Sequence, residues 1–541
     1  MASTPAGAAE SSGYETLAQL FTEWRAFERP VMRDRVGDYS AAGMAAKAAA
    51  LPGFRARLQA IDTAGWPIGE RNDYQLVAAE MDGYDFDLRV LRPWARDPAF
   101  YVSVWAARSD VPVREGPNVY PQIELYAYRF PLSAAALSEL AERLAAIPAQ
   151  LAAARINLRD SNARDLWVYG IHELRNQSQV LRALADGNLT VTTLEGSQHA
   201  DMPSRAASLH AAVEAARNAT DEFARWLESQ SPGKTGPSGV GKENYTWYQQ
   251  HVHLVPYTWD EEVALSRREL ERAQATLRLE EQRNRHLPPL EPAADAAAFD
   301  RLNHERLDKF IDFLVKEDIL PDKAHLKTVL EPRLEHFVPE GQRVFFAQVT
   351  HREPMLLLSH DYHWLDLARM RDEPHASPIR RLASLSNIWD TRAEGFATAF
   401  EEILMHAGLY DDNPRARELV WIMLANRAAR GLASLYVQAN EITLTQAGKL
   451  HGEWTPRGWA RSADELTTFE QLLYLRQPGY GTSYINGKLM VDRLLTEYAR
   501  ARELEGKGFT LREFLERFNA EGMIPVPLME SEMIPAQARE P

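Results

Sequence analysis

Long stretches of the chain repeat their apolar residues with the spacing of an α-helix. Residues 132–155 place leucine, isoleucine and alanine three and four positions apart, and residues 203–228 follow the same pattern. Both stretches are rich in alanine, which has the highest helix propensity of any residue. The pattern therefore predicts long helices that pack through one apolar face.

Two further signals concern a long helix after residue 258 and a strand near residue 343. Thr258 and Glu261 have the spacing of a capping box, in which each side chain satisfies a backbone N–H group at a helix start. Pro288 should end this helix after roughly seven or eight turns. Residues 343–350 resemble a small edge strand beside a cleft. We expect more than half of the residues in helices and fewer than about a tenth in strands, which is a mainly α fold with minimal β structure.

The chain changes composition near its middle. Residues 229–244 are rich in glycine, serine and proline and lie between predicted helices, as is typical of a linker or flexible loop. A chain of 541 residues is also longer than a single hydrophobic core usually serves. We therefore expect an N-terminal helical lobe at 14–228, a linker at 229–244, and a C-terminal helical lobe at 245–530 that carries the active site. A central cleft between two such lobes would hold a small substrate.

Composition and charge exclude several classes of function. The shares of apolar residues (45%) and charged residues (25%) are ordinary for a globular protein. The chain has no cysteine, so any metal must be held by histidine, aspartate or glutamate. The formal net charge is -15, and lysine and arginine are not clustered, which argues against nucleic acid as a partner.

The N-terminal residues have neither a basic segment nor an apolar run. No stretch of the chain approaches the roughly 18 apolar residues that a bilayer-spanning helix needs. We therefore expect a cytoplasmic protein without a membrane partner, unless a signal peptide was removed from a precursor.

The strongest candidate for chemistry is a histidine and aspartate cluster within residues 356–370. An apolar run leads into His360, Asp361 and His363. Residues three apart share one face of a helix, so both imidazoles could bind one ion. Asp361 would point about 100° away and could act as a base or as a carboxylate that orients a histidine. The alternative is that both histidines are ordinary core residues with satisfied hydrogen bonds.

A second part of the site is predicted in residues 390–404. Glu394 and Glu401 lie two helical turns apart on a face otherwise lined by small and apolar residues. A glutamate in such surroundings needs a cation. A metal ion is one candidate, and Arg427 or Arg430 is the other. We expect Glu401 and Arg430 to lie behind the metal ligands and to support them.

These segments resemble a known bacterial family. The sequence RAEGFATAFEE, followed by HAGLYDD, is similar to the Glu-Gly-Trp-Ala-x-Tyr-Ala-Glu helix of the family called domain of unknown function 885 (DUF885), members of which are related to zincin metallopeptidases. Residues 242–273, 477–489 and 509–530 resemble other segments of that family in the same order. The resemblance is clearest from the linker onward and weaker before it. It implies a large two-lobed helical fold of the zincin-like type.

The resemblance also implies a role for each candidate residue. His360 and His363 would be the histidine ligands of a zinc ion, and Glu394 would be the downstream ligand. Asp361 would replace the catalytic glutamate, and Tyr484 would face the cleft and donate to a developing oxyanion.

The chain departs from the family pattern at the metal motif. Family members carry His-Glu-x-x-Pro-Gly-His-His, whereas this chain has the shorter His360-Asp361-Tyr362-His363 without Pro-Gly. Replacing glutamate by aspartate retracts the carboxylate by about 1.5 Å. An error of that size can cost roughly a hundredfold in rate.

Three functions remain open on this pattern. The first is a zinc-dependent hydrolase of a small peptide or amide-like substrate, in which Asp361 takes a proton from water. The second is a metal-free enzyme on the same scaffold, which acts on a small aromatic molecule through His360, His363, Asp361 and Tyr484. The third is a non-catalytic binding protein.

Overall fold

A computed structural model describes residues 12–201, 206–321 and 325–535. Helices make up 66% of the structure and strands 4%, so the prediction of a mainly α fold with minimal β structure is confirmed. The strands form three short pairs: β1 (Met32–Arg33) with β2 (Val36–Gly37), β3 (Val104–Trp105) with β4 (Ile123–Glu124), and β5 (Thr190–Thr193) with β6 (Gly196–His199).

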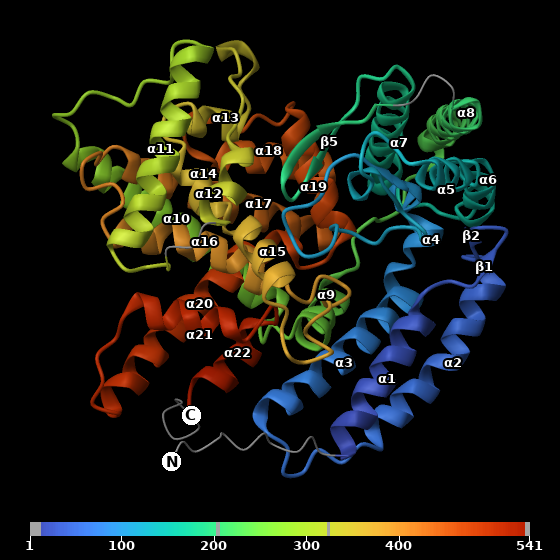
Figure 1. The fold of residues 1–541 in the computed structure, drawn as a ribbon, viewed down its shortest axis with the longest axis horizontal. Coiled ribbons are helices and arrows are strands. Elements are labelled where there is room, and N and C mark those ends of the chain that lie inside the picture. The colour runs from blue at the N-terminus through green and yellow to red at the C-terminus, as the bar shows by residue number, and fades with distance from the viewer. Residues whose placement is uncertain (1–11, 202–205, 322–324, 536–541) are drawn as a thin grey trace.

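Long helices form the centre of the C-terminal half (Figure 1). They are α10 (Trp259–Arg283), α16 (Asp390–His406), α17 (Ala416–Gln438) and α20 (Tyr480–Leu504). Helix α16 packs along α20, and α17 lies against both α10 and α20. Nearly every residue of α17 is buried, so this helix is covered around most of its circumference.

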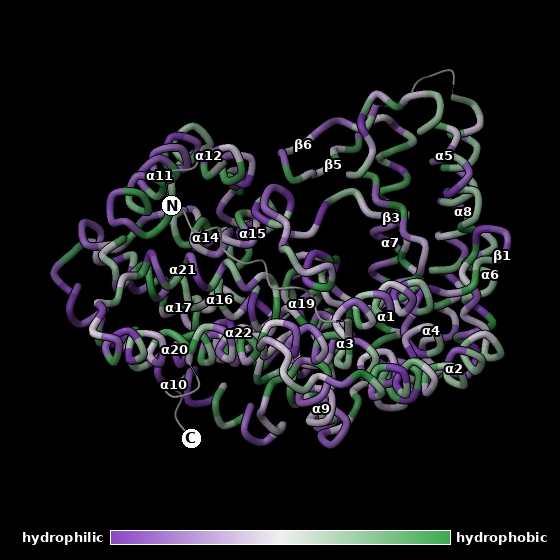
Figure 2. The backbone as a smooth tube through the Cα atoms, turned by 60° about the horizontal axis from the view of Figure 1, so that its bottom comes forward, coloured by the Kyte–Doolittle hydropathy of each residue, from purple (hydrophilic) through white to green (hydrophobic). Residues whose placement is uncertain are grey.

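Shorter helices complete the C-terminal half and connect it to the rest of the chain. They are α9 (Lys242–Tyr248), α11 (Ala296–Lys316), α12 (His325–Leu330), α13 (Phe345–Thr350), α14 (Met355–His360), α15 (Tyr362–Asp372), α18 (Leu444–Trp454), α19 (Glu465–Arg476), α21 (Leu511–Ala520) and α22 (Val526–Met533). Hydrophobic and hydrophilic residues alternate along most helices (Figure 2), as one-sided burial requires. Within the described residues, no helix has both the length and the apolar composition that crossing a bilayer requires.

The N-terminal half contributes to two separate apolar cores. Most buried apolar residues of α1 (Ser12–Glu28), α2 (Ala41–Gln59) and α3 (Ile68–Phe86) belong to the same core as the C-terminal helices. After the short α4 (Pro93–Arg96), a second core forms between α5 (Ala134–Leu144), α6 (Ile147–Asn157), α7 (Arg164–Ala185) and α8 (Ala207–Gln230). Figure 1 shows these last four helices as a group of their own at the upper right. The division into lobes at residues 229–244 stays a prediction.

The capping box expected at the start of α10 is present. The hydroxyl of Thr258 accepts a hydrogen bond from the backbone N–H of Glu261 (3.3 Å). The carboxylate of Glu261 accepts one from the backbone N–H of Thr258 (2.8 Å). Helix α10 then runs to Arg283, shortly before Pro288. The predicted long helix is therefore confirmed, because local side chains satisfy its first N–H groups.

Two local predictions were wrong. Residues 132–155 form two helices, α5 and α6, because Pro148 occupies the first turn of α6, where its missing N–H is tolerated. Within the predicted edge strand at 343–350, residues 345–350 form the helix α13 instead. Phe345 and Val349 are both buried and lie four apart, which is the spacing of one helix face.

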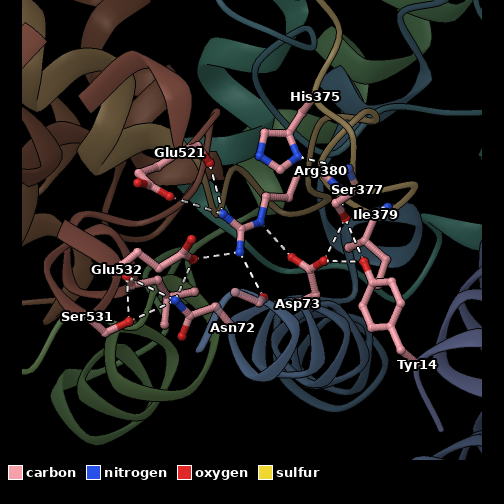
Figure 3. Close-up of polar contacts among 12 residues, drawn as sticks. Tyr14, Asn72, Asp73, His375, Ser377, Ile379, Arg380, Glu521, Ser531 and Glu532 are labelled. Carbon is pink, nitrogen blue, oxygen red and sulfur yellow. Dashed lines mark hydrogen bonds and ion pairs between the residues drawn. The ribbon is translucent and has the colours of Figure 1, made fainter. Parts of the chain in front are cut away.

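A buried arginine ties the last described helix to the first helices of the chain (Figure 3). The side chain of Arg380 is 2% exposed and donates to Asp73 of α3 and to Glu532 of α22, each over 2.6 Å. It also donates to the backbone carbonyl of Glu521 (3.1 Å). Asp73 accepts a further hydrogen bond from the phenol of Tyr14 in α1 (2.5 Å). Segments far apart in the sequence are therefore joined at one guanidinium group.

We expect Arg380→Met to lower the free energy of unfolding by about 3–5 kcal/mol, because buried carboxylates would lose their cation. Arg381→Met is the matched control. Arg381 is exposed and donates only to backbone carbonyls at 3.2 and 3.4 Å, so its loss should change the free energy by no more than about 0.5 kcal/mol. Urea unfolding followed by circular dichroism measures both values. Equal stability of the two variants would contradict the role assigned to Arg380.

Candidate metal centre

The segment that carries the two histidines is broken at Asp361. The sequence predicted one helix through this region, but α14 ends at His360 and α15 begins at Tyr362. Asp361 between them has φ −62° and ψ 6°, and the ψ value departs from the helical range. The predicted helix is therefore interrupted at Asp361, and this interruption contributes to the relative position of the two imidazoles.

The two imidazoles nevertheless meet at the carboxylate of Glu394. The Nε2 atom of His363 lies 3.2 Å from Oε2 of Glu394, and Nε2 of His360 lies 3.5 Å from the same oxygen. One ligand atom from each of the three residues lies within 4.8 Å of the other two. The imidazole planes are at 83° to each other, with ring centroids 4.9 Å apart. The structure thus brings together the three residues predicted as ligands.

Two of the three ligand–ligand distances fit the geometry of a tetrahedral zinc site. Zinc bonds to histidine and carboxylate are about 2.0–2.2 Å long, and the edges of such a tetrahedron are therefore about 3.3–3.6 Å. The two nitrogen–oxygen distances at Glu394, 3.2 and 3.5 Å, are close to that range. The donor set of two imidazoles and one carboxylate is also one that catalytic zinc sites use.

Glu394 is buried beside the two histidines, and no lysine or arginine among the described residues forms an ion pair with it. Its side chain is 5% exposed. Burial alone would raise the pKa of Glu394, but His363 and His360 hold it well below its usual range. Within the described residues, its ion pairs are with these two histidines and with no lysine or arginine. The phenol of Tyr480 donates to its other oxygen over 2.6 Å.

The pKa of His363 reflects the same contact. Burial alone would lower that pKa, but the carboxylate of Glu394 outweighs burial and raises it to about 9. In the absence of a metal ion, a proton on His363 therefore stabilises the carboxylate of Glu394. A metal ion and this proton would compete for the same nitrogen.

Glu401 and Arg427 lie behind His360. The Nδ1 atom of His360 is 3.2 Å from Oε1 of Glu401 and 3.1 Å from Nη2 of Arg427. Arg427 donates to both oxygens of Glu401, each over 2.7 Å. Arg427, and not Arg430, is therefore the cation beside Glu401. The side of His360 that faces away from Glu394 is held by an ion pair.

Arg430 lies instead beside Tyr484. Its guanidinium carbon is 4.1 Å from the centroid of the Tyr484 ring, and one of its N–H groups donates to Glu470. The ring of Tyr484 is nearly parallel to that of His360, with centroids 6.3 Å apart. Burial and the nearby charge of Glu394 raise the pKa of Tyr484 well above its usual value. Tyr484 is therefore a neutral phenol near the two histidines.

Asp361 is not one of the three residues whose ligand atoms meet at the site. Burial raises its pKa well above the usual value, Asp110 and Glu335 raise it further, and His363 and Arg333 oppose the shift. Its backbone N–H donates to the carbonyl at the preceding turn. A protonated carboxyl must lose its proton before it can act as a base, and the role of Asp361 as a base stays a prediction.

Sequence reasoning missed two contributors to the site. Tyr480 donates to Glu394 and lies one helical turn before Tyr484. Because residues four apart share a helix face, this spacing could have identified it. The other contributor is the segment around Val111 and Glu115, from the N-terminal half. Val111 packs in the apolar cluster that contains Tyr480 and Tyr484, and the carboxylate of Glu115 lies 3.5 Å from the Tyr480 phenol. No local pattern in the sequence indicates this long-range contact.

A close approach of two helices positions Tyr480 beside Glu394. A Cβ atom added to Gly395 of α16 would lie 2.4 Å from the Cα atom of Gly487 in α20. A Cβ atom added to Gly487 would lie 2.4 Å from the carbonyl oxygen of Thr391. Both contacts are with the backbone, which cannot rotate away as a side chain can. The two glycines therefore set the distance between the helices at the site.

The comparisons with known proteins identify a family and a fold. The model of the family described as "Bacterial protein of unknown function (DUF885)" matches residues 22–337. The matched range ends before His360. The segments near the site that resemble this family in their motifs therefore lie outside the matched range. No curated protein matches the chain.

Two solved structures resemble this one over nearly the whole chain. A candidate lipoprotein of unknown function from Shewanella oneidensis has 16% sequence identity and a TM-score of 0.63, and the alignment covers 97% of this chain and 100% of that one. A candidate lipoprotein from Colwellia psychrerythraea has 12% identity and a TM-score of 0.61, with 96% and 98% of the chains covered. At these identities the similarity establishes a shared fold only.

We expect Gly395→Ala to destabilise the protein by about 3 kcal/mol, at the upper end of overpacking costs, because the added methyl group meets backbone atoms. The matched control is Gly448→Ala in α18, where the nearest atom to an added Cβ is 3.7 Å away. The control should gain about 0.5–1 kcal/mol, since alanine favours a helix over glycine. Thermal unfolding measures both changes. A Gly395→Ala variant as stable as the control would mean that α16 and α20 are not in close contact.

Proposed function

The chain belongs to the bacterial DUF885 family of proteins of unknown function, and we propose that it is a metal-dependent hydrolase of the zincin type. His360, His363 and Glu394 would bind one zinc ion. The observation that carries this proposal is the meeting of two imidazole Nε2 atoms at one buried carboxylate oxygen, at distances of 3.2 and 3.5 Å. A carboxylate in that position needs a cation, and no arginine or lysine among the described residues forms an ion pair with Glu394.

The hydrogen bonds of His360 support the same proposal. Histidine ligands commonly donate their second ring N–H group to a carboxylate, which fixes the tautomer and orients the ring. Glu401 lies 3.2 Å from Nδ1 of His360 and can accept that hydrogen bond. With the proton on Nδ1, the lone pair on Nε2 points toward Glu394 and the metal position.

A bound zinc ion would supply Lewis acidity and a water of lowered pKa. Asp361, once ionised, would accept a proton from the attacking water, and Tyr484 would donate a hydrogen bond to the oxygen that gains negative charge. The substrate class is a small peptide or an amide-like molecule. Tyr480 would keep Glu394 oriented through its hydrogen bond of 2.6 Å.

One contact favours a second function. Nη2 of Arg427 lies 3.1 Å from Nδ1 of His360 and can donate to it. In that tautomer the proton is on Nε2, and His360 offers no lone pair to a metal ion. Protonated His363 and the carboxylate of Glu394 would then form an ion pair. The site would bind no metal, and together with Tyr484 and Asp361 it would catalyse acid-base chemistry on a small aromatic molecule. A non-catalytic binding protein is the remaining alternative.

The names of the two structural neighbours bear on location. Both are described as candidate lipoproteins. A lipoprotein acts at a membrane surface. The cytoplasmic location stays a prediction, and an anchored location is its alternative.

Metal analysis distinguishes the first function from the other two. We expect about one zinc ion per chain in protein purified without added metal, and loss of that zinc in His363→Asn and Glu394→Gln, because each removes one of three protein ligands. The matched control is His406→Asn, since His406 is exposed on the same helix as Glu394. Inductively coupled plasma mass spectrometry gives the metal content. Wild-type protein that holds no zinc after incubation with it would overturn the metal-dependent function.

Asp361 is the residue to test for a catalytic role. If it is the base, Asp361→Asn should keep the zinc content and lower the turnover of dipeptide or anilide substrates by roughly 10²- to 10⁴-fold. If it only orients a histidine, the same change should weaken zinc affinity about 10- to 100-fold. Asp361→Glu restores the acid of the family motif and should raise peptidase activity if the shorter side chain limits the rate. Unchanged turnover and zinc affinity in Asp361→Asn would leave only a structural role.

A further inference from the structure

A cavity of about 600 Å³ lies between α1, α3 and the segment from residue 93 to residue 126. Tyr248 and the loop at Ser386 line another of its sides. Val111 lines it, but His360, His363 and Glu394 do not, so the three candidate metal ligands lie outside the cavity. Its volume is in the range of pockets that bind small organic molecules.

Two carboxyl groups in this cavity have no partner. Glu28 is the last residue of α1, and Asp87 begins the π-helical turn Asp87–Leu91 that follows α3. Both line the cavity. Among the described residues, the side chain of neither one has a hydrogen bond or an ion pair. Both residues are half-buried. A carboxyl group that has lost part of its hydration without gaining a partner costs free energy that a ligand could recover.

The cations nearest to Glu28 are engaged elsewhere. Arg25 donates to both carboxylate oxygens of Glu80, over 2.6 and 2.8 Å. Lys47 donates to the backbone carbonyls of Phe27 and Arg29. Glu28 is therefore close to positive charge without a direct contact, and no cation influences Asp87 to a comparable degree.

Aromatic rings line the same part of the cavity. They include Tyr39, Tyr84, Trp94, Phe100 and Tyr248. The ring of Tyr39 lies 6.5 Å from Trp94 and 5.0 Å, edge on, from Phe100. Aromatic faces attract organic cations, most strongly where water is excluded. Carboxyl groups and aromatic rings together are the groups that recognise an ammonium ion.

Several arginines also line the cavity, but most have partners of their own: Arg29 over the ring of Tyr120, Arg143 with Glu139, Arg476 with Asp97, and Arg114 with the carbonyl of Ala107. Arg108 is the exception, because its side chain has no hydrogen bond or ion pair in the described part of the chain, including at Nε. An anion would be attracted to Arg108. The experiment that tests the charge of the ligand must therefore include an anionic compound.

We propose that this cavity binds a small organic cation, whose ammonium or guanidinium group lies between Glu28 and Asp87 and whose apolar part packs against the aromatic rings. The proposal does not depend on the metal centre. Binding there would give two half-buried carboxyl groups the partner that the described part of the chain does not supply.

Binding should be coupled to proton release. Burial, and to a lesser degree Glu28, raises the pKa of Asp87 to about 8, and burial also raises the pKa of Glu28. The phenols of Tyr84 and Tyr248 face Asp87 and are themselves neutral. At pH 7 the empty cavity therefore holds Asp87 largely protonated. A cation favours the ionised carboxylate, so its binding expels a proton and its affinity rises from pH 6 to pH 8.

A charge series of one size tests the ligand class. We expect 2-phenylethylamine to bind the full-length protein at least tenfold more tightly than the neutral 2-phenylethanol and the anion 3-phenylpropionate. Isothermal titration calorimetry in two buffers of different ionisation enthalpy measures both the affinity and the protons released. The proposal would be overturned if the amine does not bind at millimolar concentration, or if the alcohol or the anion binds as tightly as the amine. It would also be overturned if binding of the amine releases no proton.

Variants place the site in the structure. Asp87→Asn and Glu28→Gln keep the size of each side chain and should each weaken amine binding by about tenfold or more, and Asp87→Asn should also abolish most of the proton release. The matched control is Asp85→Asn, because Asp85 lies two residues before Asp87, pairs with Arg89 and does not line the cavity. The control should bind the amine as the wild type does. Equal affinity in all three variants would mean that the amine binds elsewhere.

Discussion

The candidate centre depends on the burial of one carboxylate, that of Glu394. Among the described residues, no lysine or arginine forms an ion pair with it. Every neighbouring feature compensates for that burial. Two imidazoles approach one of its oxygens, and a phenol donates to the other. The helix that carries it, α16, meets α20 through glycines, because any larger residue would separate the carboxylate from the phenol. A buried charge of this kind is costly unless it is neutralised, which is why the identity of the cation decides the function.

The position of one proton separates the two chemical functions. Nδ1 of His360 lies between a carboxylate that can accept its hydrogen and a guanidinium that can donate to it, at nearly equal distances. With the proton on Nδ1, the ring is ready to bind a metal ion. With the proton on Nε2, the ring donates to Glu394 instead. Glu401 and Arg427 are already paired with each other, so either state leaves their ion pair intact.

The sequence predicts most of what is local and little of what is long-range. The long helices and the capping box follow from apolar spacing and from side chains a few residues apart, so α8 and α10 are found close to the expected positions. Pro148 divides a predicted helix although the apolar pattern continues through it. Residues 343–350 are apolar enough for either element, and only their tertiary packing selects a helix.

At the site, the residue types in two short segments indicate the two histidines and Glu394. The break at Asp361 does not follow from them, because it depends on backbone geometry that apolar spacing does not report. Arg427 and Arg430 are equivalent in sequence terms, being three residues apart on one buried helix, and only the packing of α17 assigns one to Glu401 and the other to Tyr484. The contact between Glu115 and Tyr480 joins residues 365 positions apart, which no local pattern encodes.

The hydrogen bonds of Arg380 affect when the protein can fold during translation. Asp73 is translated about three hundred residues before Arg380, which neutralises it. At the usual synthesis rate of roughly 5–20 residues per second, the delay between the two is tens of seconds. Glu532, the other partner, is translated 152 residues after Arg380. Helices α1 to α3 therefore cannot complete their contacts with this arginine and with α22 until Glu532 has been translated. A nascent chain that stops before Glu532 leaves that part of their surface uncovered, where chaperones and proteases can bind it.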